Sequence, residues 1–346
     1  MTYQSHVSLG RQIGNGHFGV VHEGVDDIHG PVAIKIPRQH PHETDVAWQA
    51  RRAELLSEGQ FLSRAKHSNV VHVHKLVKHK VSDDLLLVME FCAGGSLQKP
   101  YEIGPMSSSL VHRYATDIVL GLSALHERGM IHRDIKPGNI LVDAAGRAKL
   151  GDFGLVTDAI ILGYADRAGY RDHLAPEVTL TGQTSTRTDV WALGMTLYRL
   201  LHGHPWYTAS PMPRVLIPAG GFANTLSWLP HVSSRWRRLI RSMLNDESSS
   251  RPTIVQIQNA LAGIADDMDW DCSGGANVCN WQTNRAGRRI DVKCERKGTK
   301  FEWVATSSPS VGAGRTRRLG ASSQLSNWTT TLRELRAFFD RMRGSR

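Results

Sequence analysis

The chain has 346 residues, 40% of them apolar, and a formal net charge of +10. This size allows one large core, or two lobes plus a small extra unit. No run of about eighteen apolar residues occurs and the first residues lack the apolar stretch of a secretory signal, so we expect no membrane span and a cytoplasmic protein. Only four cysteines occur in a chain of this length, which argues against a disulfide framework and favours reducing surroundings.

Residues 9–91 have the composition of β-strands, rich in Val, Ile and Leu, and a helical stretch interrupts them near residues 48–65. A glycine-rich segment between the first two apolar runs predicts a hairpin. Glycines there let backbone amides approach a polyphosphate closely. The same spacing in isolation more often marks an ordinary turn, so its meaning depends on the segments that follow. The candidate phosphate-binding residues are Gly14, Asn15, Gly16, His17, Phe18 and Gly19.

A lysine among apolar neighbours, Lys35, lies on the next predicted strand. It can extend its ammonium from a sheet edge into solvent, or it can pair with nucleotide phosphates. The second role needs a carboxylate that holds the ammonium in place. Glu54 and Glu58, both on the helical stretch, are the two candidates.

Residues from about 110 onward are mainly helical in pattern, and two segments among them carry most of the chemical information. One contains Asp134, Lys136 and Asn139, and the other, residues 149–154, contains Asp152. Phosphoryl transfer needs charge neutralisation on the phosphates and an oriented hydroxyl, with little covalent help from the protein. Each acid or amide alone is more often a turn or capping residue, but their joint occurrence in this order favours catalysis.

The order of these motifs resembles the eukaryotic-type (Hanks-type) serine/threonine protein kinase family. The resemblance implies an α+β, bilobal fold, with a small β-rich N-lobe at residues 7–91, a hinge at 90–95 and a larger helical C-lobe at 96–265. It also implies ATP as the nucleotide, Mg²⁺ as the metal with Mn²⁺ as an alternative, and protein substrates that are phosphorylated on serine or threonine.

The resemblance assigns a role to each residue of the two catalytic segments. Asp134 would accept or orient the proton of the substrate hydroxyl, and Lys136 would steady the transferred phosphoryl group. Asn139 and Asp152 would hold the metal. Lys136 is also the residue usual at its position in kinases that phosphorylate serine or threonine.

The family pattern also chooses between the two glutamates. Its helix glutamate stands nine positions before the histidine of an HxN segment, which here begins at His67. That spacing selects Glu58 over Glu54 as the partner of Lys35.

The run from Leu87 to Gly95 matches the interlobe hinge of the family, although by itself it indicates only a buried strand that ends in a turn. The resemblance makes Met89 the gatekeeper and assigns adenine contacts to the backbone of Glu90 and Cys92. The residues that would sandwich the adenine ring are Val21, Ala33 and Leu141.

Three further segments match the family. Ala175 to Glu177 matches the end of the activation segment, residues 189–194 match the helix that anchors the catalytic loop, and Arg251 would pair with Glu177. We expect that ion pair to be structural, since losing one member of a buried pair costs about 3–5 kcal/mol.

The substrate-facing segment departs from the family pattern. Tyr170 lies near the position where serine/threonine kinases usually have a threonine, which bears on substrate choice. Arg133 is typical of kinases whose activation segment is ordered by a phosphorylated residue. The acceptors on offer are Thr157, Tyr164 and Tyr170, with Asp166 as an acidic substitute.

The sequence also allows a second hypothesis besides an active kinase. A pseudokinase, or ATP-binding scaffold, that recruits partners through its C-terminal part is the alternative from another functional class. The complete set Lys35, Glu58, Asp134, Asn139 and Asp152 argues against it, because loss of one or more of these residues is the usual sign of a pseudokinase.

Residues 266–346 differ in composition from the rest and predict a separate basic appendage. They contain no histidine, and 15 Lys and Arg against 9 Asp and Glu leave a net charge of +6. Alternation over residues 289–305 predicts a β-hairpin with a turn at Lys297-Gly298, and an amphipathic helix capped by Asn327 ends the chain. We expect the appendage to dock on a protein partner or on the kinase, with nucleic acid as the weaker alternative.

Overall fold

The computed structural model describes residues 6–16, 19–39, 43–62, 66–79, 84–152, 173–208, 220–264, 269–275, 277–311 and 314–344, without the side chains of residues 54–62. The chain divides into two compact units, Met1–Leu97 with Asp117–Asp189, and Gln98–Thr116 with Val190–Arg346. Each unit is described by itself below.

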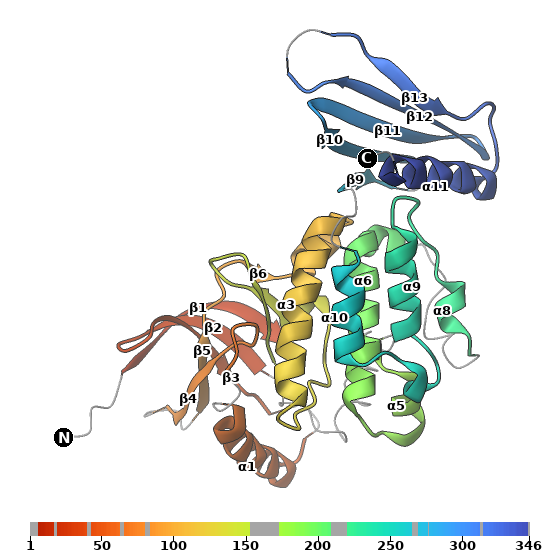
Figure 1. The fold of residues 1–346 in the computed structure, drawn as a ribbon. Helices are drawn as coiled ribbons and strands as arrows, with labels where there is room; N and C mark the ends of the chain where they lie inside the picture. The colour runs from red at the N-terminus through yellow and green to blue at the C-terminus, as the bar shows by residue number, and fades with distance from the viewer. Residues whose placement is uncertain are drawn as a thin grey trace. The chain divides into compact units, whose positions relative to one another are not determined.

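The first unit contains an antiparallel five-stranded sheet (Figure 1) in the order β1-β2-β3-β5-β4. β-branched and leucine side chains at alternate positions give it a buried apolar core of Val32, Ile34, Ile36, Leu86 and Val88. One helix, α1, follows β3, as the sequence predicts. The bounds are β1 (Val7–Gly16), β2 (Gly19–Asp26), β3 (Gly30–Ile36), α1 (Asp45–Leu62), β4 (Val73–Lys78) and β5 (Leu85–Glu90).

A second, three-stranded sheet of the same unit frames the catalytic segments, in the order β6-β7-β8. The short 3-10 helix η1 (Pro137–Asn139) leads directly into β7, and the chain returns through β8 toward Asp152. α3 (Ser108–His126) precedes the catalytic segment, and α5 (Pro176–Thr181) follows it. The strands are β6 (Gly95–Ser96), β7 (Ile140–Val142) and β8 (Ala148–Leu150).

The second unit has a helical part built around α6 (Thr186–Thr208), whose apolar side chains from Val190 to Leu201 are buried. Gly203 interrupts α6 with a left-handed backbone, φ 72°. Local capping fixes the next helices: Ser233 accepts from the Trp236 amide, and Thr253 and Gln256 form a capping box. The other helices are α2 (Gln98–Ile103), α8 (Phe222–Thr225), α9 (Ser234–Met243), η4 (Ser248–Ser250) and α10 (Ile254–Ala262).

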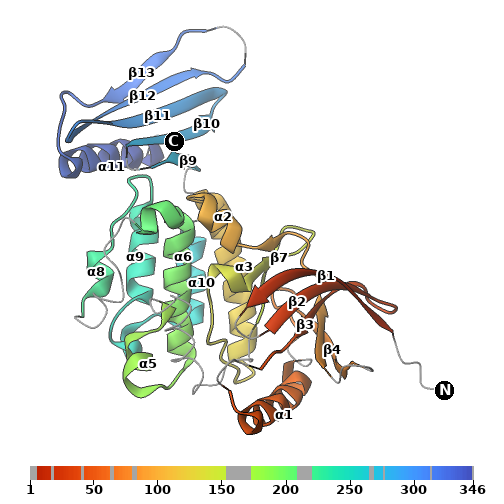
Figure 2. The ribbon, with the colours of Figure 1, turned by 180° about the vertical axis from the view of Figure 1, so that it is seen from behind.

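The C-terminal part of the second unit is a five-stranded antiparallel sheet, order β13-β12-β11-β10-β9, with one long helix against one face (Figure 2). The predicted hairpin is its centre, β11 paired with β12, and Asn327 caps the final helix by accepting from the Thr330 amide at 2.9 Å. The bounds are β9 (Asp271–Gly274), β10 (Val278–Arg285), β11 (Arg288–Lys297), β12 (Lys300–Pro309), β13 (Arg317–Ala321) and α11 (Trp328–Gly344).

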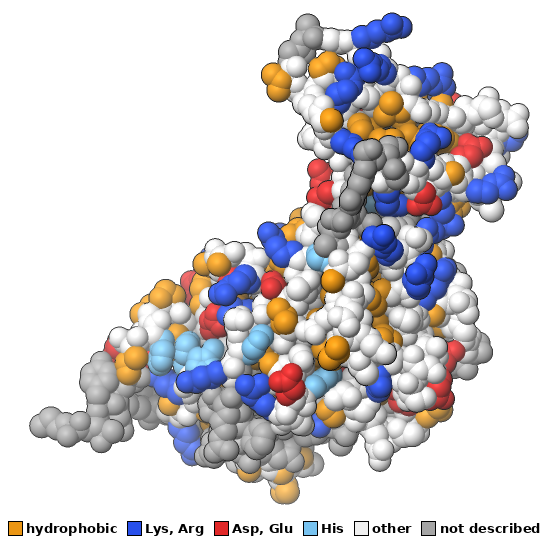
Figure 3. Space-filling model, viewed as in Figure 1, with side chains coloured by type: hydrophobic (Ala, Val, Ile, Leu, Met, Phe, Trp, Pro, Cys, Tyr) orange, Lys and Arg blue, Asp and Glu red, His pale blue; other side chains and the backbone are white. Residues whose placement is uncertain are grey.

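Aromatic side chains join α11 to this sheet. Phe339 packs against Trp281 at 5.5 Å between ring centroids, and Phe338 packs against Trp303 at 5.4 Å. Many Lys and Arg side chains lie on the surface of the C-terminal part in the view of Figure 3.

The fold class predicted from the sequence, α+β with a β-rich region before a mainly helical one and a small α+β appendage, is confirmed. None of the helices described here is long and apolar enough to cross a membrane.

Candidate active site

The catalytic segment brings three predicted residues into one hydrogen-bonded group. The Lys136 ammonium lies 2.8 Å from Asp134 Oδ2, and the Asn139 amide nitrogen donates to the same oxygen at 2.7 Å. Asn139 also donates to the Asp134 carbonyl at 2.8 Å. Lys136 and Asn139 are buried, while Asp134 is only partly buried. The Asp134 carboxylate is therefore held in one orientation by a buried ammonium and a buried amide. Asn139, at the end of η1, lies five positions after Asp134, which makes the contact local.

A buried carboxylate holds the backbone that leads into this group. Asp189, at the start of α6, accepts from the His132 and Arg133 amides at 2.8 Å each, and from His126 Nε2 at 2.8 Å. Arg133 has φ 71°, a left-handed conformation that costs a non-glycine residue about 1–3 kcal/mol. Three hydrogen bonds to one carboxylate offset that strain and fix the backbone direction at the next residue, Asp134.

Lys35 and Asp152 meet although 117 positions separate them in sequence. The Lys35 ammonium donates to Asp152 Oδ1 at 2.8 Å, and Lys35 is only 3% exposed. Register in the β-sheet places Lys35 opposite Val21 of β2 on one side and Leu87 of β5 on the other, so the lysine emerges from the centre of the sheet. Asp152 has φ 56°, a second strained residue at this site.

Electrostatics keep the Asp152 carboxylate ionised. Burial raises its pKa, but the Lys35 ammonium, its hydrogen bond and the more distant Lys136 outweigh burial, and the pKa lies below the usual range. Burial lowers the pKa of His132, so its ring is neutral at pH 7 and can accept from the Asp134 amide at 3.3 Å.

The donor set fits a divalent cation. Asn139 uses its amide nitrogen on Asp134, which leaves the amide oxygen as the atom that can serve as a metal ligand. Asp152 supplies an ionised carboxylate. Oxygen ligands of this kind suit Mg²⁺ and equally Mn²⁺.

The strands position the predicted nucleotide residues. In the β1–β2 hairpin Gly14 pairs with Val21, Asn15 with Val20 and Gly16 with Gly19. Gly19 has φ 137°, and an added Cβ would lie 2.2 Å from the Ile36 carbonyl oxygen, so only glycine fits where β2 meets β3. His17 and Phe18 lie outside the described residues.

Two of the predicted adenine-binding residues lie on adjacent strands of the five-stranded sheet. Ala33 of β3 pairs with Met89 of β5, and both are buried, as is Cys92. Burial raises the pKa of Cys92 to about 12, so the thiol is neutral and apolar. Leu141 lies on β7, where it pairs with Lys149 and with Ser96.

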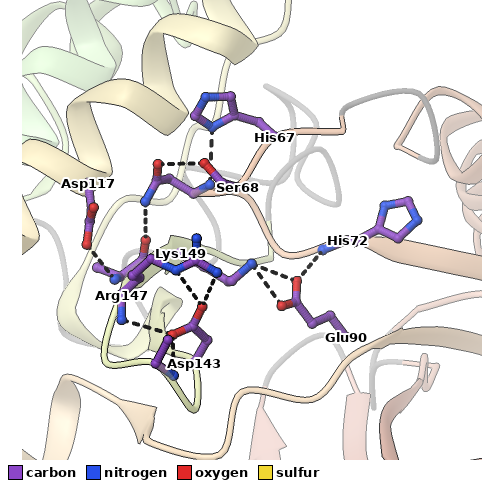
Figure 4. Close-up of polar contacts among 11 residues, drawn as sticks. His67, Ser68, His72, Glu90, Asp117, Asp143, Arg147 and Lys149 are labelled. Atoms are coloured by element: carbon purple, nitrogen blue, oxygen red, sulfur yellow. Dashed lines mark hydrogen bonds and ion pairs between the residues drawn. The ribbon is translucent and has the colours of Figure 1, made fainter. Parts of the chain in front are cut away.

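An ion pair that the sequence did not reveal connects the predicted hinge to the strand that leads to Asp152 (Figure 4). The Glu90 side chain pairs with the Lys149 ammonium at 2.8 Å and accepts from the His72 amide at 3.3 Å. Lys149 is 5% exposed and lies three positions before Asp152. The one available signal was a lysine within the apolar β8 strand.

The HxN segment is tied to the same strand. Asn69 is buried, donates to the Ala148 carbonyl at 3.0 Å, and its own carbonyl accepts from the Leu150 amide at 2.9 Å. Asp117 on α3 accepts from the Ala148 amide at 2.8 Å. The strand that carries Lys149 is therefore held from two sides.

Several predicted residues cannot be placed. Glu58 lies on α1, but its side chain is outside the described residues, as is that of Glu54. Thr157, Tyr164, Asp166 and Tyr170 fall in residues 153–172, which also lie outside the described residues.

Arg133, the residue typical of kinases with a phosphorylated activation segment, donates from Nε to Thr184 Oγ1 at 3.1 Å. The expected pairing of Glu177 with Arg251 remains a prediction.

The comparisons with known proteins agree with this geometry. Residues 7–261 match the model of the protein kinase domain. The chain belongs to the protein kinase family.

Within the protein kinase family, one relative is hormonally up-regulated neu tumor-associated kinase homolog A of Xenopus laevis, 32% identical over 257 residues, which are 72% of this chain and 36% of the relative. The human hormonally up-regulated neu tumor-associated kinase is 31% identical over 269 residues, 73% of this chain and 37% of its own. The serine/threonine-protein kinase ssp1 of Schizosaccharomyces pombe is 28% identical over 289 residues, which are 78% of this chain and 44% of the relative. The chain thus matches less than half the length of these relatives.

Proposed function

We propose that this chain transfers the γ-phosphoryl group of ATP to serine or threonine hydroxyls of protein substrates. The observation that carries the proposal is the Asp134 group, in which Lys136 at 2.8 Å and Asn139 at 2.7 Å hold one partly exposed carboxylate oxygen. Such a carboxylate can orient a substrate hydroxyl and accept its proton as the phosphorus–oxygen bond forms.

The residues divide the chemistry between them. Asp134 orients the attacking hydroxyl, while Lys136, a point charge beside it, steadies the transferred phosphoryl group. Lys35 meets the phosphates of the nucleotide, and Glu58 holds that lysine when α1 is in place. When bound, Mg²⁺ neutralises the charge of the phosphates, and Asn139 and Asp152 are the residues that would hold it.

The nucleotide base is assigned to the hinge. The backbone of Glu90 and Cys92 would bind adenine beside Met89, with Val21, Ala33 and Leu141 above and below the ring. The phosphates would lie under the backbone amides of residues 14–19, in a loop that glycines keep free of side chains.

Specificity for serine and threonine is supported by Lys136, which contacts Asp134, and by the name of the relative ssp1, a serine/threonine-protein kinase. The alternative of an ATP-binding scaffold without catalysis is disfavoured, since every residue of the catalytic and metal set is present.

The test is phosphoamino-acid analysis. The purified chain is incubated with γ-labelled ATP, Mg²⁺ and a histone as a generic basic substrate, beside an Asp152→Asn variant. We expect label on phosphoserine or phosphothreonine with the native chain and a loss of about 10²-fold or more in the variant, because the metal loses its charged ligand. Phosphotyrosine would overturn the specificity, and equal label in both proteins would overturn the assignment of Asp152.

A further inference from the structure

The second unit contains a cavity of about 690 Å³ that no kinase motif explains. Side chains from the end of α6, from residues 226–229, from the sheet β9–β12 and from α11 line it. Its volume lies within the range of about 300–1,000 Å³ of small-molecule sites, which are concave, mostly apolar and carry a few polar groups.

Aromatic rings form much of the wall. Trp328 of α11 lies 6.2 Å from Trp206 of α6 and 5.0 Å from Phe301 of β12, between ring centroids. These three residues line the cavity together with Trp228. Flat rings from three separate elements suit a flat, apolar ligand body.

The thiols in the wall contribute no charge. Cys279 and Cys294 are directly opposite each other on β10 and β11, and both line the cavity. Burial raises the pKa of Cys279 to about 11 and that of Cys294 to about 12, so both stay protonated at neutral pH and act as small apolar groups. No group of three or more His, Cys, Asp or Glu in the described part of the chain is arranged to hold a metal ion.

Two buried donors in the wall point to an acceptor. Neither Trp228 Nε1 nor Arg336 Nε has a hydrogen-bond partner within the described part of the chain, and Trp228 is only 2% exposed. Arg336 Nη2 donates to the Trp228 carbonyl at 3.4 Å, which joins the two side chains. Native proteins rarely leave such donors unpaired, because burial without an acceptor is unfavourable.

The charge at this wall is positive. Arg336 and, at the rim, the exposed Arg296 line the cavity, and of the described lining residues none is Asp or Glu. Burial and then the neighbouring Arg241 lower the pKa of Arg336, whereas Asp340 partly compensates. Asp340 is itself paired with Arg343 at 2.6 Å.

We propose that this cavity is a binding site for a small aromatic carboxylate. Its ring system lies among Trp206, Phe301 and Trp328, and its carboxylate accepts from Trp228 Nε1 and from the Arg336 guanidinium. The ligand would thereby bind helices of the kinase region and the C-terminal appendage at once, which gives the appendage a role in sensing a small molecule. This site does not depend on the proposed kinase activity.

The test uses two isosteric probes on the full chain, 2-naphthoate and its uncharged amide, 2-naphthamide. Isothermal titration is carried out with saturating ADP present, so that the nucleotide site is filled. We expect saturable, one-to-one binding of 2-naphthoate, and binding of the amide weaker by about tenfold or more, since charge-assisted hydrogen bonds are the stronger ones.

Two variants and a control locate the site. Arg336→Gln should lower the affinity for 2-naphthoate by about tenfold and change the affinity for 2-naphthamide little. Leu332→Trp, which fills the cavity, should lower the affinity for both probes. Arg333→Gln is the matched control, because Arg333 lies on the same helix and is exposed outside the cavity. Circular dichroism checks the fold of each variant.

The proposal is overturned by any of three results: no saturable binding of 2-naphthoate, equal affinity for the acid and the amide, or full affinity for both probes in a folded Leu332→Trp variant. Should Arg336→Gln fail to fold, the acid–amide comparison on the native chain and the Leu332→Trp variant still decide the matter.

Discussion

Asp189→Asn separates the support of the catalytic loop from its chemistry. The native carboxylate accepts three hydrogen bonds of 2.8 Å, two from backbone amides and one from His126, and Asp189 is 1% exposed. Asparagine keeps one acceptor oxygen and turns an NH₂ donor toward the remaining donors. A hydrogen bond to a charged group contributes about 1.5–3 kcal/mol, so losing one or two lowers the free energy of unfolding by about 2–5 kcal/mol.

Activity should fall further than stability explains. Without the Asp189 anchor the left-handed Arg133 can relax, which moves Asp134, and a displacement of about 1 Å at a reacting group can lower kcat by about 10². We would measure urea unfolding by fluorescence and kcat at saturating ATP. Asp246→Asn is the matched control, because Asp246 is exposed and accepts from the Gly221 amide. We expect that variant to change the free energy of unfolding by less than about 0.5 kcal/mol. If Asp189→Asn keeps native stability and kcat, the loop is not held as described.

Three further predictions concern the rest of the chain. Glu90→Gln strands the buried Lys149 and should lower the free energy of unfolding by about 1–3 kcal/mol, and the double variant with Lys149→Met should recover most of this loss in a double-mutant cycle. Burial lowers the pKa of His231 to about 3 from an ordinary 6.5, so as the pH falls the unfolded chain binds the proton before the folded chain does. The free energy of unfolding should therefore fall by up to about 2 kcal/mol between pH 6.5 and 5. His231→Gln should reduce this pH dependence, measured by urea titrations. Gly203→Ala should lower Tm by several degrees, because Gly203 has φ 72° and an added Cβ would lie 2.3 Å from the Gly104 carbonyl carbon. Gly263→Ala is the control and should leave Tm unchanged, because Gly263 has an ordinary φ and the nearest atom to an added Cβ is 3.4 Å away. Equal Tm values for the two variants would contradict the strain argument.

The catalytic segment was predictable because its residues act through local spacing. Asp134, Lys136 and Asn139 lie within six positions, and a hydrogen-bonded group of that size follows from one turn of chain. The resemblance predicted Glu58 as the partner of Lys35 and did not predict the contact of Lys35 with Asp152, since nothing in composition or periodicity brings together residues 117 positions apart.

Features that depend on tertiary packing were missed. The Glu90–Lys149 pair forms between a hinge residue and a strand, and each of these residues alone has an ordinary explanation. In the appendage the sequence predicted one hairpin of two strands, whereas the described sheet has five. Of the three missed strands, β9 and β13 are short edge strands with weak alternation, and β10 is an inner strand of eight residues. The cavity beside Trp328 could not be predicted at all, since its wall comes from elements far apart in the sequence.

The cysteines illustrate the same limit. Cys279 and Cys294 are 15 positions apart in sequence, and only the β10–β11 register places them directly opposite each other. Register is set by the whole sheet, and a shift of one residue would turn every side chain of a strand to the other face.

The most direct test of the central claim is the Asp134→Asn variant, compared with the native chain for both phosphoryl transfer and ATP affinity. The substitution keeps the shape of the side chain and removes the proton acceptor, so we expect kcat for histone phosphorylation to fall by about 10²–10⁴ while the Kd for ATP, measured by isothermal titration with Mg²⁺, changes by less than about threefold. A variant that retains native kcat would contradict the assignment of Asp134 as the catalytic carboxylate, and with it the account of this site.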